Sequence, residues 1–243
     1  MKMFAKIVLG LLGVLALSGC IPLTDPTPTY RYRLTVEIDT PEGLKTGSSV
    51  IEVDTRVAGK RSIPSPGRRS QKVRGEAVAI EMPDGKVLFA LLRSDDFVDW
   101  AGTVLYMLGP KFRGEDAVAQ TVKAIVSDRR EKTLPRYFPR AGRNPRMSGY
   151  PMLVTFEDLS DPTTVTRVDP DDLAATFGEG VSISRITVQV TDDPVTTGIE
   201  ERLGWLPNYY DKMLDGNRIR TIEAENRFAN NLSQGDFSKG TFQ

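Results

Sequence analysis

Apolar and polar side chains alternate along residues 30–39, YRYRLTVEID. In an extended chain Tyr32, Leu34, Val36 and Ile38 would point to one side, because successive side chains of a strand face opposite ways. The charged and hydroxyl-bearing residues between them would point to the other side. This stretch therefore predicts a β-strand with one face in a hydrophobic core and one face in solvent, and we expect the following segments to pack on its apolar face.

Three further strands are predicted after this one, separated by turn residues. They cover residues 48–57, 72–82 and 87–93, and the tight-turn sequence PDG at residues 83–85 precedes the last of them. The last strand is apolar on both faces, which is typical of a central strand that is covered on both sides. The simplest arrangement of the four strands is an antiparallel meander.

Two helices are predicted next, because apolar residues recur at helical spacing in residues 97–108 and 115–130. Ser94 or Asp95 could cap the first helix, since a short side-chain oxygen can accept hydrogen bonds from the amides of the first turn. The second helix has its acids at the start and its bases at the end, as the helix dipole favours.

The second half of the chain repeats the β pattern. Strands are predicted at residues 152–156, 163–168 and 182–191, with a short helix that starts at Asp169. A polar helix is predicted for residues 218–232. An aromatic cluster precedes that helix and is interpreted as part of the core or of a lid rather than as a ligand platform; it consists of Trp205, Tyr209 and Tyr210.

These elements predict an α+β fold: an antiparallel β-meander with two packed helices, then a second β-rich part with short helices. The body would extend over residues 30–243. An irregular segment between the two parts leaves a second possibility open, in which residues 30–132 and 150–243 form two subdomains.

The composition excludes several kinds of catalytic chemistry. The chain has 243 residues, with 32 Lys and Arg against 32 Asp and Glu, one cysteine and no histidine. The lack of histidine rules out histidine-containing catalytic triads and the commonest metal ligand, and a single cysteine cannot form an internal disulfide. Lys45 lies near Ser48, but this pair is better explained by hairpin-turn chemistry than by a Ser–Lys nucleophile. No cofactor is expected.

Two acidic groups are candidates for catalytic or calcium-binding residues. Asp95, Asp96 and Asp99 could supply the paired carboxylates that glycoside cleavage requires. The acidic run at residues 169–172 could offer oxygen ligands to calcium, although its spacing does not match an EF-hand loop. Both groups stand where helices are expected to begin, so a role in helix capping is the favoured interpretation.

The start of the chain has the layout of a secretory signal peptide. Two lysines are followed by an apolar run at residues 7–17, which is too short to cross a bilayer, since a crossing requires about 20 residues. The run leads to the only cysteine through the sequence Leu17-Ser18-Gly19-Cys20. This sequence resembles the lipobox of bacterial lipoproteins.

The resemblance implies that residues 1–19 are removed, that Cys20 is acylated, and that residues 20–29 form a flexible tether. Several acyl chains would anchor the protein stably in a membrane. In that family an Asp after the cysteine retains many lipoproteins at the inner membrane, and Ile21 here favours the periplasmic side of the outer membrane. The body from Tyr30 onward resembles an uncharacterised proteobacterial envelope family, which implies no activity.

A basic arm at residues 129–146 is the strongest candidate for a binding site, because it carries seven basic residues against Glu131 alone. Arginines interleaved with an aromatic residue can bind phosphate or carboxylate groups. In the alternative interpretation these arginines pair with the acidic segment at residues 157–201 of the same molecule. The candidate binding residues are Arg136, Tyr137, Arg140, Arg143 and Arg146.

The sequence therefore predicts a lipid-anchored envelope protein with a non-enzymatic binding or structural role that faces the periplasm. Its expected partners are the membrane, through the N-terminal lipid, and an envelope protein, a lipid headgroup or peptidoglycan. Nucleic acid does not fit the compartment. Two alternatives stay open: a cell-wall hydrolase that uses only carboxylates, and an accessory subunit of an envelope or secretion complex.

Overall fold

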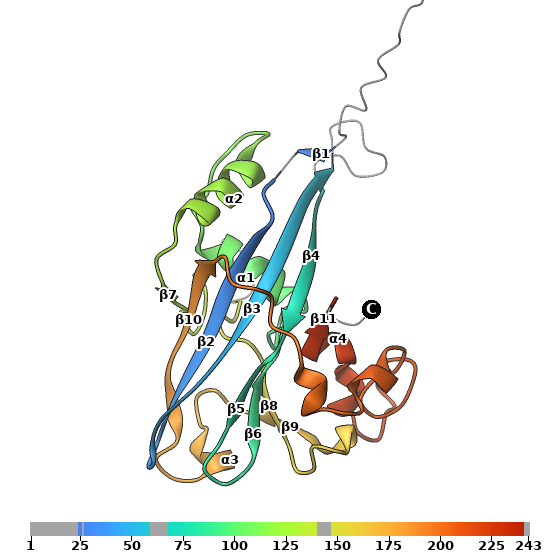
Figure 1. The fold of residues 1–243 in the computed structure, drawn as a ribbon. Coiled ribbons are helices and arrows are strands. Elements are labelled where there is room, and N and C mark those ends of the chain that lie inside the picture. The colour runs from blue at the N-terminus through green and yellow to red at the C-terminus, as the bar shows by residue number, and fades with distance from the viewer. Residues whose placement is uncertain (1–23, 26, 59–67, 140–146, 241–243) are drawn as a thin grey trace, which may run out of the picture.

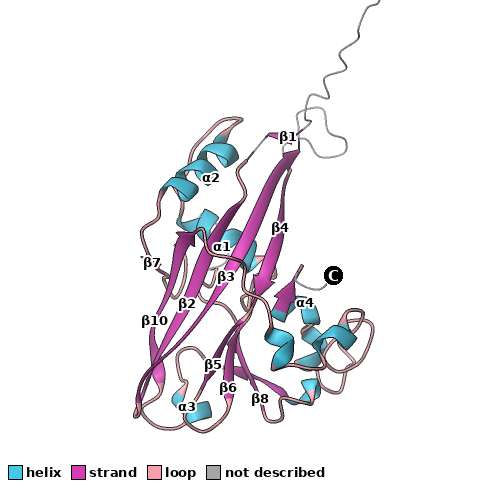
Figure 2. Cartoon of the chain, in the orientation of Figure 1, coloured by secondary structure: helices cyan, strands magenta, loops and turns pink. Residues whose placement is uncertain are grey.

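Two antiparallel β-sheets with helices packed on them form the body in the computed structural model (Figure 1, Figure 2). The structure describes residues 24–25, 27–58, 68–139 and 147–240. This architecture confirms the predicted α+β class.

The elements follow one another as strands, two helices, and a second part in which strands alternate with short helices. The strands are β1 Thr24–Asp25, β2 Tyr30–Thr40, β3 Gly43–Ala58, β4 Arg69–Glu76, β5 Val78–Glu81, β6 Val87–Ala90, β7 Lys132–Thr133, β8 Leu153–Phe156, β9 Val165–Val168, β10 Ser182–Thr191 and β11 Ser238–Lys239. The helices are α1 Trp100–Leu108, α2 Ala117–Ser127, α3 Ala174–Phe177 and α4 Gln234–Phe237, with 3-10 turns η1 Pro162–Thr164, η2 Ile199–Glu201, η3 Leu206–Tyr209 and η4 Ala229–Asn231.

The first sheet has the strand order β11-β4-β3-β2-β10-β7, and β1 pairs with the end of β3. Strands β2 and β3 form a long hairpin, in register from Tyr30 opposite Val53 to Thr40 opposite Gly43. The alternation that predicted the first strand is confirmed, because every second side chain of β2 from Tyr30 to Ile38 is buried and those between are half-buried.

The predicted strand at residues 72–82 is wrong as a single strand, because the chain changes sheets within it. β4 pairs with β3, whereas β5 pairs with β6 in the second sheet. Ala77 separates the two strands, and Gly75, two residues before it, has a φ of 144°, a backbone conformation that residues with a Cβ adopt rarely. The predicted four-stranded meander is therefore divided between two sheets.

The second sheet has the strand order β5-β6-β8-β9, and its two faces are covered by two different hydrophobic cores. In β6, Leu88 and Ala90 belong to the core shared with the first sheet and the helices. Val87 and Phe89 belong to a second core, closed by the C-terminal segment. This two-sided burial confirms the prediction of a strand covered on both faces.

Aromatic side chains fill much of the second core. The ring of Phe89 lies edge-on to those of Phe156 and Phe237, with centroids 5.7 and 6.0 Å apart. Trp205 packs against Phe237 at 6.0 Å and against Tyr209 at 5.3 Å. Trp205 and Tyr209 thus take the predicted core role, whereas Tyr210 is 79% exposed.

The two ranges considered as subdomains, 30–132 and 150–243, are interleaved in both sheets. β10 comes from the later range and pairs with β2 along its length, and β8 pairs with β6. The sheets therefore join the two ranges into one body.

The helices α1 and α2 are shorter than predicted but lie where the apolar periodicity placed them. Trp100 begins α1 and is fully buried, with its indole donating a hydrogen bond to the carbonyl oxygen of Gly149. The hydroxyl of Tyr32 donates to the carbonyl of Ala101, at 2.7 Å, and so connects the same helix to β2. Neither Ser94 nor Asp95 caps α1, because Asp99 occupies the N-cap position.

The predicted helix at residues 218–232 is wrong. Most of this stretch forms turns, and only η4 and its neighbours approach helical geometry. Asn230 accounts for the turn conformation: its side chain accepts a hydrogen bond from the Thr221 amide and donates to the Ile219 carbonyl. Side-chain amides that bond to nearby backbone groups compete in this way with helix formation.

Thr24, Asp25 and Thr27, which belong to the predicted flexible tether, pack on the body. Thr24 and Asp25 pair with Ala58 and Val57 of β3, and the hydroxyl of Thr27 donates a hydrogen bond to the carbonyl of Thr55. Cys20 and the rest of the lipobox lie outside the described residues. Among the helices in the described ranges, none has the length and apolar character needed to cross a membrane.

Replacement of Gly47 by alanine tests the close packing of the two sheets. A Cβ at this position would lie 2.6 Å from Cγ1 of Ile80 and 2.9 Å from the carbonyl oxygen of Ala79, both in β5. We expect Gly47→Ala to lower the free energy of unfolding by about 2 kcal/mol through overpacking, measured by urea denaturation. Gly204→Ala is the matched control, because nothing lies within 4 Å of its Cβ position; equal losses in both variants would contradict this account.

Candidate functional site

Arg136, in the basic arm, is held within the molecule. Its guanidinium donates two hydrogen bonds of 2.9 Å to the carboxylate of Asp171 and a third, of 3.2 Å, to the Ser148 hydroxyl. The guanidinium also stacks over the ring of Tyr137, 4.5 Å from its centroid. Of the candidate binding residues, Arg136 and Tyr137 are thus in contact with each other, whereas Arg140, Arg143 and Arg146 lie outside the described residues.

Pairing between the arm and the acidic segment is confirmed for two arginines. Besides the contact of Arg136 with Asp171, Arg129 forms an ion pair with Asp192. Hydrogen bonds from Arg136 hold the pKa of the Asp171 carboxyl below its usual value. In this structure Arg136 therefore supports the fold, and a ligand at this position would have to displace Asp171.

Of the three acids considered for catalysis, Asp95 and Asp96 have structural partners in the described part of the chain. Asp95 pairs with Arg167 at 2.6 Å, and Asp96 accepts hydrogen bonds from the Ser148 amide and the Ser94 hydroxyl. Asp169 accepts a hydrogen bond from the amide two residues further on. Within the described ranges, no group of three or more His, Cys, Asp or Glu side chains could hold a metal ion.

A buried ion pair that the sequence did not reveal joins the C-terminal segment to the second sheet. A nitrogen of Arg93 lies 3.7 Å from an oxygen of Asp236, and the side chains are 7% and 6% exposed. Burial raises the pKa of Asp236, although the charge of Arg93 acts in the opposite direction. Both groups have further partners, because Arg93 donates to the Asn231 carbonyl and Asp236 completes a capping box with Ser233.

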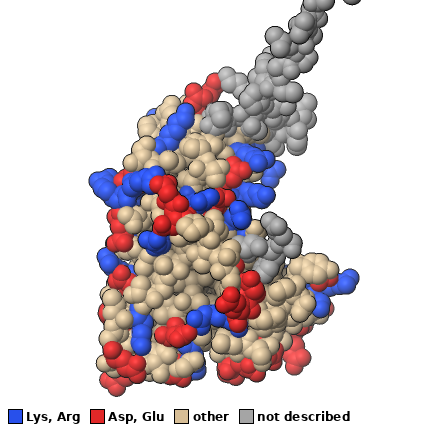
Figure 3. All heavy atoms as spheres, in the orientation of Figure 1, with Lys and Arg blue, Asp and Glu red and all other residues tan. Residues whose placement is uncertain are grey.

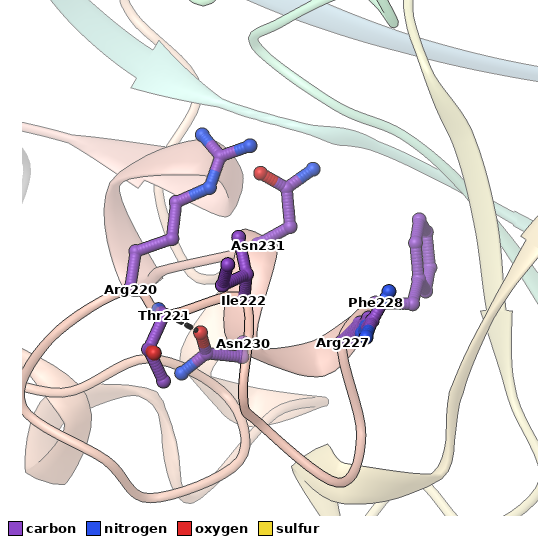
Figure 4. Close-up of a pocket in the computed structure, with 7 residues that line it drawn as sticks. All are labelled: Arg220, Thr221, Ile222, Arg227, Phe228, Asn230 and Asn231. Atoms are coloured by element: carbon purple, nitrogen blue, oxygen red, sulfur yellow. Dashed lines mark hydrogen bonds between the residues drawn. The ribbon is translucent and has the colours of Figure 1, made fainter.

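One recess in the described part of the chain lies in the C-terminal segment (Figure 4). Its volume is about 580 Å³, and Figure 4 shows the side chains of Arg220 and Asn231 pointing the same way, with Phe228 on the opposite side. The hydrogen bond from Thr221 to Asn230 closes the loop behind it. The residues that line it are Arg220, Thr221, Ile222, Arg227, Phe228, Asn230 and Asn231.

Exposed apolar side chains surround this recess. Ile219 is 71% exposed and Ile222 is 83% exposed. Neither Arg220 nor Arg227 forms an ion pair with another described residue. An apolar surface beside two cations without acidic partners is suited to a partner that has both apolar groups and carboxylates. This site was not predicted, because the apolar periodicity of residues 218–232 indicates a helix; the three asparagines between residues 226 and 231 were the available signal.

Charge is distributed unevenly over the molecule. In Figure 3 the Lys and Arg side chains gather on the upper half of the visible face, and Asp and Glu side chains are prominent along its lower rim. Many of the upper cations are paired with acids, for example Arg31 with Glu52.

Comparison of the chain with models of protein families, with curated proteins and with solved structures found no match.

The pairing of Arg136 with Asp171 can be measured by a double-mutant cycle with Arg136→Gln and Asp171→Asn. Near pH 7 we expect a coupling of about 0.5 kcal/mol in the free energy of unfolding, a modest value because the pair is partly solvated. The folded-state pKa of Asp171 is lowered, so this stabilisation is present above its unfolded value of about 3.9 and is lost as the pH falls through the folded pKa.

Urea denaturation of the wild type, the two single variants and the double variant, at neutral and acidic pH, gives the free energies of unfolding from which the coupling is calculated. Additive effects of the two substitutions at neutral pH would contradict the pairing and would leave Arg136 available for a partner.

Proposed function

We propose that this protein is a lipid-anchored envelope protein that faces the periplasm and binds another envelope component without catalysing a reaction. The observation that carries this proposal is the position of the only cysteine, directly after Leu17-Ser18-Gly19 and an apolar run. Several acyl chains on one residue suffice for stable membrane anchoring. Ile21 after the cysteine favours the outer membrane.

The surface around the C-terminal recess is the better candidate for partner binding. Ile219 and Ile222 expose apolar area that a folded chain normally buries or uses for contacts. The neighbouring Arg220 and Arg227 would orient an acidic partner through charge-assisted hydrogen bonds. The described part of the basic arm offers less, because Arg136 already binds Asp171.

A carboxylate-dependent hydrolase gains no support from the described acids. Asp95 and Asp96 are engaged by Arg167 and Ser148. Glycoside cleavage requires two carboxyl groups that face a substrate cleft, whereas the recess described above is lined by arginines, asparagines and apolar residues.

Acylation of Cys20 is tested directly by intact-mass analysis of the protein purified from bacterial membranes. We expect a mature chain that begins at Cys20 and carries covalently bound lipid, and we expect Cys20→Ser to abolish both processing and membrane retention. A mature chain that begins at another residue and carries no lipid would overturn the anchoring proposal.

Site-specific photo-crosslinking in cells tests the binding surface. A photoreactive residue in place of Arg220 should give a discrete crosslinked species with an envelope protein, and Ile219→Ser together with Ile222→Ser should reduce its yield at least several-fold. Leu44 is the matched control position, because it is 56% exposed and belongs to the β2–β3 hairpin, outside the recess. Equal yields from positions 220 and 44 would contradict a specific site.

A further inference from the structure

The N-terminal pairing restricts how far the body can stand from a membrane. β1 begins at Thr24 and is paired with the end of β3. Under the proposed function, which this inference presupposes, the lipid is attached at Cys20, so four peptide links separate it from β1. A fully extended chain spans at most about 3.5 Å per residue, so Thr24, which pairs with the end of β3, lies within roughly 14 Å of the acylated residue. One particular end of the body must then adjoin the lipid headgroups.

The loop between α1 and α2 lies at this same end, at the top of Figure 1. Contacts connect it to β1 step by step: Asp25 is opposite Val57, and Val57 is opposite Arg69. The guanidinium of Arg69 lies 4.1 Å from the centroid of the Tyr106 ring, and the ammonium of Lys111 lies 4.8 Å from the same centroid. The ammonium also donates a 2.6 Å hydrogen bond to the Tyr106 carbonyl oxygen, which fixes the start of the loop.

The loop presents an aromatic residue between two cations. Phe112 is 42% exposed, and its neighbours Lys111 and Arg113 are exposed as well. Aromatic side chains are enriched at the boundary between headgroups and hydrocarbon, and Lys and Arg near the surface are attracted to anionic lipids. An exposed aromatic residue with flanking cations at the anchored end of the body fits this boundary.

Four cations of this end lack the acidic partners that other cations of the first sheet have, although Arg56 at the same end pairs with Asp54. Arg31, Arg33 and Arg129 form ion pairs with acids. In contrast, no ion pair is found among the described residues for Arg68, Arg69, Lys111 or Arg113. Two acids, Glu115 and Asp116, follow in the same loop and equal its two cations in number, so Arg68 and Arg69 beside the loop supply the excess positive charge.

We propose that the loop tip Lys111-Phe112-Arg113, together with Arg68 and Arg69, contacts the anionic phospholipid surface in which the protein is anchored. Phe112 enters the headgroup boundary, and the four cations neutralise lipid phosphates. This contact orients the body so that the C-terminal recess, which lies at the lower right of Figure 1, faces away from the membrane.

Fluorescence quenching by brominated lipids tests this contact. The acylated Phe112→Trp protein is reconstituted into vesicles of phosphatidylglycerol and phosphatidylethanolamine whose lipids carry brominated acyl chains. We expect its emission to fall at least twofold relative to unbrominated vesicles. Wild-type protein should change little, because Trp100 is fully buried and Trp205 is 9% exposed. Phosphatidylcholine vesicles or high salt should weaken the quenching, since both reduce the electrostatic attraction.

Charge variants in the Phe112→Trp background separate a specific contact from mere tethering. Lys111→Gln with Arg113→Gln should restore most of the emission, whereas Arg227→Gln, which removes an unpaired cation from the recess, should leave the quenching unchanged. Unchanged urea midpoints verify that the variants are folded. No quenching beyond that of the wild type, or equal quenching in all charge variants, would overturn the proposal.

Intact mass and flotation of the same samples identify which hypothesis has failed. Acylated protein that floats with the vesicles but shows no quenching overturns the loop contact alone. Protein without lipid at Cys20 that does not float overturns the anchoring proposal and, with it, the contact that presupposes anchoring.

Discussion

The burial of the second sheet on both faces is the constraint on which the structure depends. β6 contributes Leu88 and Ala90 to one core and Val87 and Phe89 to the other. Each buried side chain of this size contributes about 2 kcal/mol by leaving water, so both faces must be covered at once. The first sheet with α1 and α2 covers one face, and the C-terminal segment with Phe237 covers the other.

This constraint explains why segments far apart in sequence meet. The C-terminal segment has little regular structure, and it is held by groups that satisfy buried polar atoms: Arg93 against Asp236, and the Glu76 carboxylate, which accepts hydrogen bonds from the amides of Gly198 and Ile199. A buried charge without such partners would cost several kcal/mol. These contacts allow an irregular segment to close a core, and they leave its outer loops to form a recess.

The candidate sites differ in how far they could be predicted. Lys111, Phe112 and Arg113 are adjacent in sequence, but their position beside the N-terminal segment depends on the contacts of Arg69 and Lys111 with Tyr106. The arginines of the basic arm were evident from composition. The bidentate contact of Arg136 with Asp171, however, gives Arg136 a role in stabilising the fold instead of the predicted role in binding a partner. The recess is formed by turns in residues 218–232, a stretch whose apolar periodicity predicted a helix.

The sequence by itself determined the local elements whose periodicity is strong: the alternating β2, the doubly apolar β6, the helices α1 and α2, and the α+β class that follows from them. The tertiary structure alone decided which strands share a sheet, that the predicted strand at residues 72–82 divides at Ala77, and that most of residues 218–232 forms turns. The reason is physical. The apolar periodicity of a segment indicates which of its side chains will be buried, and it is a property of that segment alone. Strand pairing and the covering of a sheet face depend on which distant segments of the chain can bury those side chains.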